Sequence, residues 1–204
     1  MQQVAIGVRM HSGWGALVAV SNSAGSVEVI ERRRISVTAP ATPGVNQPYH
    51  HAANLKLPEA KKFIAKSFAN SKRQATSAIR ELLAELSARQ YQVAGTAVLQ
   101  SASRPLPPLQ KILAAHPLLH AAEGQFFREA FAKACETLGL AVTKIREREL
   151  EAQARQTFGK AAKRVQLQIS TQGREIGPPW TADQKSAALA ASVLLANKSR
   201  RRKK

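Results

Sequence analysis

A chain of 204 residues, 44% of them hydrophobic, is long enough to bury the core of one well-packed domain, which excludes extended disorder. Lysine and arginine total 31 against 13 acidic residues, and the formal charge of +18 favours anionic partners, above all nucleic acid. The single cysteine, Cys135, excludes a disulfide framework and a cysteine-rich zinc module.

The ends of the chain bear on localisation and domain limits. No stretch approaches the roughly 18 consecutive apolar residues that cross a bilayer, and MQQVAIGVRM lacks the basic region and long apolar run of a signal peptide. We therefore expect a cytoplasmic protein without membrane contact. Residues 1–197 are predicted to form a single α/β domain. Residues 198–204, with six basic residues, are expected to be a disordered tail that aids solubility or adds salt-sensitive phosphate contacts.

The first 37 residues predict three strands joined by short turns. Residues 4–8 and 16–20 are apolar runs separated by a turn with two glycines. Residues 27–37 follow a second turn signal, and their apolar side chains occupy alternate positions, as in a strand with one buried face. The alternating residues are Val27, Val29, Ile35 and Val37. Three consecutive strands of this kind predict an antiparallel meander.

The rest of the chain predicts helices that alternate with two more strands. Residues 39–58 contain four prolines and are interpreted as a connection that crosses the fold. The predicted helices cover 59–89, 117–138, 147–168 and 182–196, and the predicted strands cover 93–99 and 140–145. Gly139 is expected to end the second helix, and Thr181 to cap the last. The fold class is therefore α/β, with a mixed five-stranded sheet and helices on its faces.

This order of elements resembles the ribonuclease H-like fold, and within it the RuvC-type Holliday-junction resolvases. Residues 4–20 resemble the opening hairpin of that fold. AEGQFF at 122–127 is similar to the segment in which resolvases place an acidic residue before an apolar helix. DQKSAALA at 183–190 is similar to their last helix, where an aspartate precedes an Asp-Ala-Leu-Ala run.

The resemblance implies a two-metal nuclease site on three or four carboxylates, the first of them an aspartate inside the first strand. Two divalent cations need several anionic oxygens to offset their mutual repulsion. Asp183 is the single aspartate of this chain, and no acidic residue precedes Glu28. Only Glu123 and Asp183 match carboxylate positions of the family, and Arg9 is a candidate for the first-strand position. Either the fold is kept without the chemistry, or different groups perform it.

Histidines supply the clearest alternative groups. His116, His120 and Glu123 lie at i, i+4 and i+7, so on one helix they share a face, and this spacing suits zinc or another divalent metal. Alternatively, His116 is only a cap before Pro117, and His120 is a half-buried helix residue. His50, in the crossing connection, is a candidate third ligand or general acid, or else a solvated loop residue.

Further candidates lie in the first hairpin and among the basic residues. His11 is placed to transfer protons near neutral pH. Trp14 and Trp180 either stack on a base or anchor the core. Arg33 is expected on the same strand face as Val29, Ile35 and Val37, where a lone charge needs a carboxylate, with Glu123 or Asp183 as the candidates. The predicted phosphate contacts are Arg9, Arg32, Arg33, Arg34, Arg128 and Lys185.

The sequence thus predicts a nucleic-acid-binding protein of ribonuclease H-like fold. Its most specific form is an atypical metal-dependent nuclease with His11, His120, Glu123 and Asp183 as catalytic groups and His116, His120 and Glu123 as ligands of a divalent metal. The alternatives are a binding or scaffold protein that has lost the carboxylate site, and a hydrolase of a small anionic substrate. The catalytic set requires that the first hairpin, the histidine helix and the last helix meet at one edge of the sheet. No pattern indicates an oligomeric state.

Overall fold

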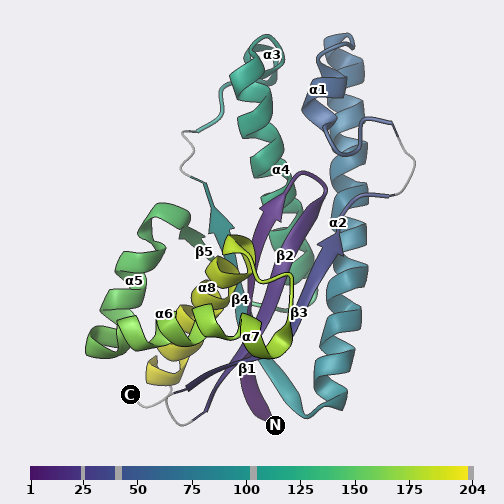
Figure 1. Cartoon of the computed structure of the whole chain (residues 1–204). Coiled ribbons are helices and arrows are strands. Elements are labelled where there is room, and N and C mark those ends of the chain that lie inside the picture. The colour runs from purple at the N-terminus through teal and green to yellow at the C-terminus, as the bar shows by residue number, and fades with distance from the viewer. Residues whose placement is uncertain (24–25, 40–42, 102–104, 202–204) are drawn as a thin grey trace.

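The computed structural model describes residues 1–23, 26–39, 43–101 and 105–201. Five strands form one sheet in the order β3-β2-β1-β4-β5 (Figure 1). Their bounds are β1 Gln2–His11, β2 Trp14–Ser23, β3 Ser26–Ser36, β4 Tyr91–Gln100 and β5 Val142–Arg146. The first three pair antiparallel, whereas β4 pairs parallel with both β1 and β5. This confirms the predicted mixed sheet.

Helices cover both faces of the sheet (Figure 1). Helices α2 (Leu57–Ala88) and α4 (His116–Thr137) pack on one face, over a core that includes Phe127 and Phe131. Helix α8 (Ala182–Arg201) covers the other face together with α5 (Leu150–Phe158) and α6 (Ala162–Thr171). The shorter elements are α1 Pro48–Ala52, α3 Leu109–Leu113, η1 Glu147–Glu149, η2 Gly159–Ala161 and α7 Gly173–Ile176.

The predicted helix over 147–168 is broken into shorter pieces. Gly159 adopts a positive φ of 55° at the end of α5, a conformation that an L side chain rarely tolerates. The chain then passes through η2 into α6. In the described part of the chain, no helix combines the length and the apolarity that a membrane span requires.

A shift of register in β3 changes which side chains share a face. Ala19 pairs with Glu31, but the next residue of β2, Val20, pairs with Val29, so β3 carries one extra residue. Val27 and Val29 consequently pack into the α8 core, whereas Ile35 and Val37 pack into the α2 core. The expectation that all four share one face was wrong, because the bulge inverts the alternation.

Helix α8 lies unusually close to β1, and Gly7 makes this approach possible. A Cβ atom at Gly7 would overlap the carbonyl group of Ala187 and come within 3.1 Å of the backbone nitrogen of Ala191. Both obstacles belong to the helix backbone, which cannot rotate away as a side chain can. The N-terminus of α8 is thereby fixed beside the end of β1.

The last helix also extends beyond its predicted end. Residues 198–201, expected to begin a disordered tail, belong to α8. The Lys198 ammonium donates to the carbonyl of Ala94, and Arg200 Nη2 donates to the carbonyl of Thr157 at 2.6 Å. These contacts hold the end of α8 against β4 and α5. Residues 202–204 lie outside the described part of the chain.

Candidate functional site

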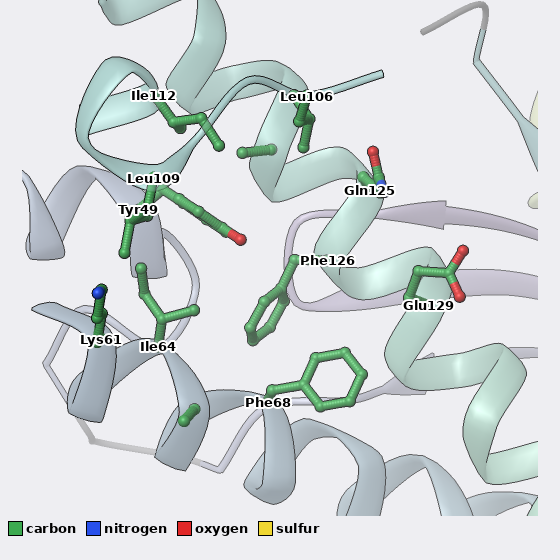
Figure 2. A pocket seen from close by; sticks show the side chains of 12 residues that line it. Tyr49, Lys61, Ile64, Phe68, Leu106, Leu109, Ile112, Gln125, Phe126 and Glu129 are labelled. Atoms are coloured by element: carbon green, nitrogen blue, oxygen red, sulfur yellow. The ribbon is translucent and has the colours of Figure 1, made fainter. Parts of the chain in front are cut away.

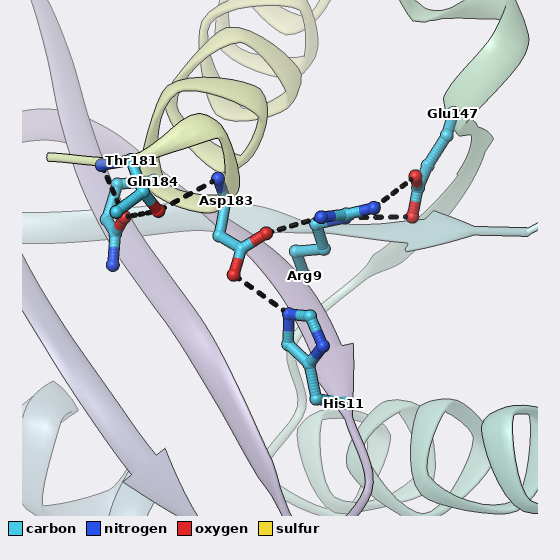
Figure 3. Close-up of polar contacts among 6 residues, drawn as sticks. All are labelled: Arg9, His11, Glu147, Thr181, Asp183 and Gln184. Carbon is cyan, nitrogen blue, oxygen red and sulfur yellow. Dashed lines mark hydrogen bonds and ion pairs between the residues drawn. The ribbon is translucent and has the colours of Figure 1, made fainter.

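Arg9 bridges two carboxylates at the end of β1 (Figure 3). Its Nε and Nη2 atoms donate to the two oxygens of Glu147 at 3.2 and 2.9 Å, and Nη1 donates to Oδ1 of Asp183. The other Asp183 oxygen lies 2.9 Å from Nε2 of His11. We call Arg9, His11, Glu147 and Asp183 the Arg9 cluster. It joins residues up to 174 positions apart in the sequence.

Three elements position this cluster. Arg9 and His11 are two residues apart on β1, so both side chains project from the same face, toward α8. Asp183 stands in the first turn of α8, whose start is fixed by Thr181: the Thr181 hydroxyl accepts the Asp183 N–H at 3.3 Å. The predicted cap at Thr181 is therefore confirmed. Glu147 follows directly after β5.

The charges of the Arg9 cluster stabilise one another. Hydrogen bonding to Glu147 is the largest cause that raises the pKa of Arg9 above its ordinary value. Partial burial acts to raise the pKa of Asp183, but the hydrogen bond from Arg9 and the charges of His11 and Arg9 outweigh it, so that this pKa lies below its ordinary value. Arg9 is thus a permanent cation between two carboxylates near neutral pH.

Two of the predicted phosphate contacts lie near the Arg9 cluster. Arg128, on α4, is only 7% exposed, and its Nε atom is buried without a hydrogen-bond partner. Burial lowers the pKa of Arg128, and the negative charges of Glu147 and Glu129 oppose this shift. Lys185, in the first turns of α8, lines a cleft of about 390 Å³ that Glu147 also lines.

Arg33 lies elsewhere. It does share a face with Ile35 and Val37, but its guanidinium pairs with Glu85 of α2 at 2.6 Å and with Glu31 at 3.4 Å. The predicted pairing with Glu123 or Asp183 was therefore wrong. The α2 helix runs along this face of β3, which the sequence pattern does not reveal.

The aromatic candidates are engaged in contacts within the protein. The rings of His11 and Trp14 stack with centroids 4.3 Å apart, and the Arg34 guanidinium lies 3.9 Å from the centroid of Trp14. The Trp180 indole donates to the carbonyl of Ile169 at 2.7 Å and packs against the α8 core. Trp180 therefore anchors the core, whereas Trp14 links the Arg9 cluster to the basic run of β3.

The predicted histidine group forms a second cluster, at the junction of α1 and α4. The rings of His50, His116 and His120, which we call the histidine cluster, contact one another edge to face, with centroids 4.6 to 5.2 Å apart. Glu123 is 2% exposed and accepts hydrogen bonds from His50. Glu123 thus contacts a histidine and is not joined to Asp183.

The predicted catalytic set is therefore divided between two places. His11 and Asp183 belong to the Arg9 cluster, while His120 and Glu123 belong to the α1–α4 junction. Within the described ranges, no hydrogen bond, ion pair or ring contact joins the two groups. The first group also contains Glu147, which was not predicted from the sequence. Its position directly after the last strand was the available signal, because parallel strands end at the same edge.

An apolar cavity of about 530 Å³ lies between the projecting ends of α2 and α4 (Figure 2). Ile64, Phe68 and Phe126 line its floor, and the Tyr49 ring enters from α1. Burial is the main cause that raises the pKa of Tyr49, and the charge of Glu123 adds to it. The cavity therefore borders the histidine cluster through Tyr49.

The Arg9 cluster does not fit a pair of divalent cations. Both oxygens of Asp183 and both oxygens of Glu147 already accept hydrogen bonds or ion pairs, three of these contacts being with one guanidinium. A metal ion there would have to displace Arg9, and the remaining two carboxylates would be fewer than a two-metal site needs. The positive charge at this edge of the sheet is supplied by the guanidinium of Arg9.

Comparison with solved structures identifies proteins of similar architecture. RuvC of Thermus thermophilus, solved with a Holliday junction substrate, aligns with a TM-score of 0.55 and 13% identity over 97% of this chain and 96% of that one. A second RuvC structure from T. thermophilus aligns with a TM-score of 0.51 and 12% identity over the same shares. The chain has a RuvC-like, ribonuclease H-like fold. Neither a family model nor a curated protein sequence matches it.

The Arg9 cluster lies where three elements of the fold come together. The first strand, the segment directly after the last strand and the last helix meet at one sheet edge. We expected the first hairpin, the histidine helix and the last helix to meet there. The hairpin and the last helix do so, whereas His120 and Glu123 of α4 lie in the other cluster. In this RuvC-like chain, that edge presents an arginine on β1. The identity of 12 to 13% leaves the fold as the shared property.

Proposed function

We propose that this protein binds nucleic acid at the sheet edge around the Arg9 cluster, as a RuvC-like domain that does not cleave by two-metal chemistry there. The observation that carries the proposal is the guanidinium of Arg9 on the first strand, bridging Asp183 and Glu147. An arginine at this point occupies the carboxylate oxygens, and the chain as a whole carries a formal charge of +18, which favours anionic partners.

Arg128 supplies a further argument for an anionic ligand near this edge. A buried guanidinium without full hydrogen bonding costs several kcal/mol, unless a carboxylate or phosphate satisfies it. Its Nε atom has no partner among the described residues, although the charges of Glu147 and Glu129 act on it. Arginine side chains bind carboxylates and phosphates in bidentate geometry. Lys185 lines the cleft beside Glu147 and is a second candidate for a phosphate contact.

The direct test measures binding to four-way junction, duplex and single-stranded DNA and RNA by fluorescence anisotropy in EDTA over a range of salt concentrations. The T. thermophilus RuvC complex with a Holliday junction is the reason to include the junction. Affinity should fall linearly with salt on a log–log plot, as phosphate contacts release counterions. Absence of salt-sensitive binding to every one of these nucleic acids would contradict the proposal.

Arg128→Met separates binding from stability. The loss of a charge-assisted phosphate contact should weaken binding roughly tenfold or more and lower the salt slope by about one. The free energy of unfolding should not fall, because the variant removes an incompletely bonded buried charge. Arg80→Met on α2, an exposed arginine, is the control with the same charge change. Equal binding losses in both variants would show only a general charge effect.

A metal-dependent nuclease is the second candidate, and the histidine cluster is the observation that favours it. Cleavage of the same substrates in Mg²⁺, Mn²⁺ or Zn²⁺ that is lost in His120→Ala and kept in Asp183→Asn would support this candidate. Cleavage that depends on Asp183 in Mg²⁺ would contradict the proposal that the Arg9 edge only binds.

A further inference from the structure

The junction of α1 and α4 brings three imidazole rings together at the protein surface. One nitrogen atom from each of His50, His116 and His120 lies within 4.8 Å of the other two. His116 and His120 are exposed, and His50 is about one-fifth exposed. The elements come from distant parts of the sequence, so this arrangement is a product of the tertiary fold.

Two helices present these rings. His116 is the first residue of α4, with Pro117 behind it, so the i, i+4 pair with His120 has helical geometry. This excludes the interpretation of His116 as a cap outside the helix. His50 lies in α1. The preceding residue of that helix, Tyr49, packs edge to face on Phe126 of α4, with ring centroids 6.2 Å apart.

Glu123 fixes the orientation of His50. One carboxylate oxygen accepts the backbone N–H of His50 at 3.2 Å and lies 2.8 Å from its Nδ1. When Glu123 is ionised it can only accept hydrogen bonds, and the proton of this contact then lies on Nδ1 of His50. The lone pair of Nε2 is then left for a ligand. A carboxylate behind a histidine is the arrangement that orients metal-bound imidazoles in proteins.

From these contacts we propose that His50, His116 and His120 bind one divalent transition-metal ion of the zinc type, with Glu123 as the positioning residue behind His50. Neutral imidazole is a preferred ligand of Zn²⁺, Co²⁺, Ni²⁺ and Cu²⁺. In this proposal Glu123 is not a ligand, whereas the sequence-based prediction made it one. The inference does not depend on the proposed nucleic-acid binding.

The geometry requires only a small closure. Zn–N bonds of about 2.0–2.1 Å in a tetrahedral site place the nitrogens about 3.4 Å apart. The present separations, up to 4.8 Å, can close by side-chain rotation of the two exposed histidines. Three protein ligands leave a fourth position open to water or to an anionic oxygen, which is the arrangement of catalytic zinc sites.

The test uses the full chain without an affinity tag, stripped with EDTA, and titrates Co²⁺ and Zn²⁺ in separate experiments. Co²⁺ should produce visible d–d bands of a four-coordinate ion that saturate at one equivalent, and Zn²⁺ should abolish them by displacement. Calorimetry should give one Zn²⁺ site, and Zn²⁺ should raise the melting temperature of the protein.

Single substitutions identify the side chains that bind the metal ion. His116→Ala and His120→Ala should each lower Zn²⁺ affinity about 100-fold or more, and Glu123→Gln should lower it roughly 10- to 100-fold. His51→Ala is the matched control: His51 adjoins His50 but stacks on Phe63, with centroids 4.3 Å apart, and its loss should leave the affinity unchanged. Because Glu123 is buried, the Glu123→Gln protein can unfold. The His116→Ala and His120→Ala variants change exposed residues, so they test the site without loss of the fold.

The results that support the metal site differ from those that overturn it. One equivalent of Zn²⁺ that is retained by His51→Ala and lost by His116→Ala and His120→Ala supports the site. No saturable Co²⁺ spectrum, or equal affinities in the His51→Ala and His120→Ala proteins, would overturn it. Nucleic-acid binding in EDTA is measured separately, so its failure leaves this result unaffected.

Discussion

Arg9 is the residue that distinguishes this sheet edge at the scale of single side chains. Its guanidinium separates two carboxylates that would otherwise repel each other, and it does so with three donors. An arginine cannot lose its charge at any pH at which the fold persists. The edge therefore keeps a permanent positive charge, whereas a bound metal ion could dissociate.

Arg9→Asp tests this view by reversing the charge. Asp183, Glu147 and the new carboxylate would repel one another, so stability should fall, and Mg²⁺ should recover about 1–3 kcal/mol of it by binding their oxygens. The measurement is urea unfolding with and without Mg²⁺. Arg9→Met, which leaves only two carboxylates, should recover less. Equal recovery in the two variants would contradict this account.

Asp183 should contribute to the acid sensitivity of the protein. Its pKa lies below the ordinary value, so its stabilisation is present above the unfolded-state pKa of about 3.9 and is lost as the pH falls through the lowered folded-state pKa. Urea unfolding between about pH 5 and pH 2 should show a smaller loss for Asp183→Asn than for the wild type. Identical pH profiles would mean that Asp183 is not stabilised as described.

At the scale of elements, the contact of α8 with β1 decides whether the Arg9 cluster can form. The helix approaches the strand at Gly7, and its first turn then carries Asp183 to Arg9 and His11. The small residues Ala187 and Ala191 on α8 meet this glycine and are fully buried. The alanine-rich character of the helix thus serves close packing.

Gly7→Ala should be strongly destabilising. The added methyl group meets helix backbone, and such overpacking costs about 1–3 kcal/mol or more. Gly15→Ala on the neighbouring strand is the control, since its methyl would meet the flexible side chain of Met10 and should cost less. Chemical denaturation of both variants checks the order. A Gly7→Ala protein as stable as the Gly15→Ala protein would contradict the close approach.

At the scale of the whole molecule, the end of α8 ties together elements that the sequence separates widely. Lys198 reaches the carbonyl of Ala94 in β4, and Arg200 reaches that of Thr157 in α5. Both are charge-assisted bonds to backbone oxygens. Lys198 and Arg200 of the basic end of the chain are therefore structural.

Substitution at this end should reduce global stability. Lys198→Met and Arg200→Met each remove one charged donor to a carbonyl, a loss of about 1–2 kcal/mol each. Lys163→Met, at an exposed position on α6, is the control and should change the free energy of unfolding by less than about 0.5 kcal/mol. Unchanged unfolding of the Lys198→Met and Arg200→Met proteins would show that these bonds do not support the fold.

The sequence determined the order of the elements, the mixed sheet and the pairing of His116 with His120, because hydrophobic period and helical spacing are local properties. It also marked Arg9, Asp183 and His50 as candidates by residue type. Only the tertiary structure decided which of them meet. Bringing Glu147 to Arg9 and Glu123 to His50 depends on contacts over 138 and 73 residues, which no local period encodes. The bulge in β3 and the partner of Arg33 were likewise settled by packing, since one extra residue exchanges the two faces of a strand.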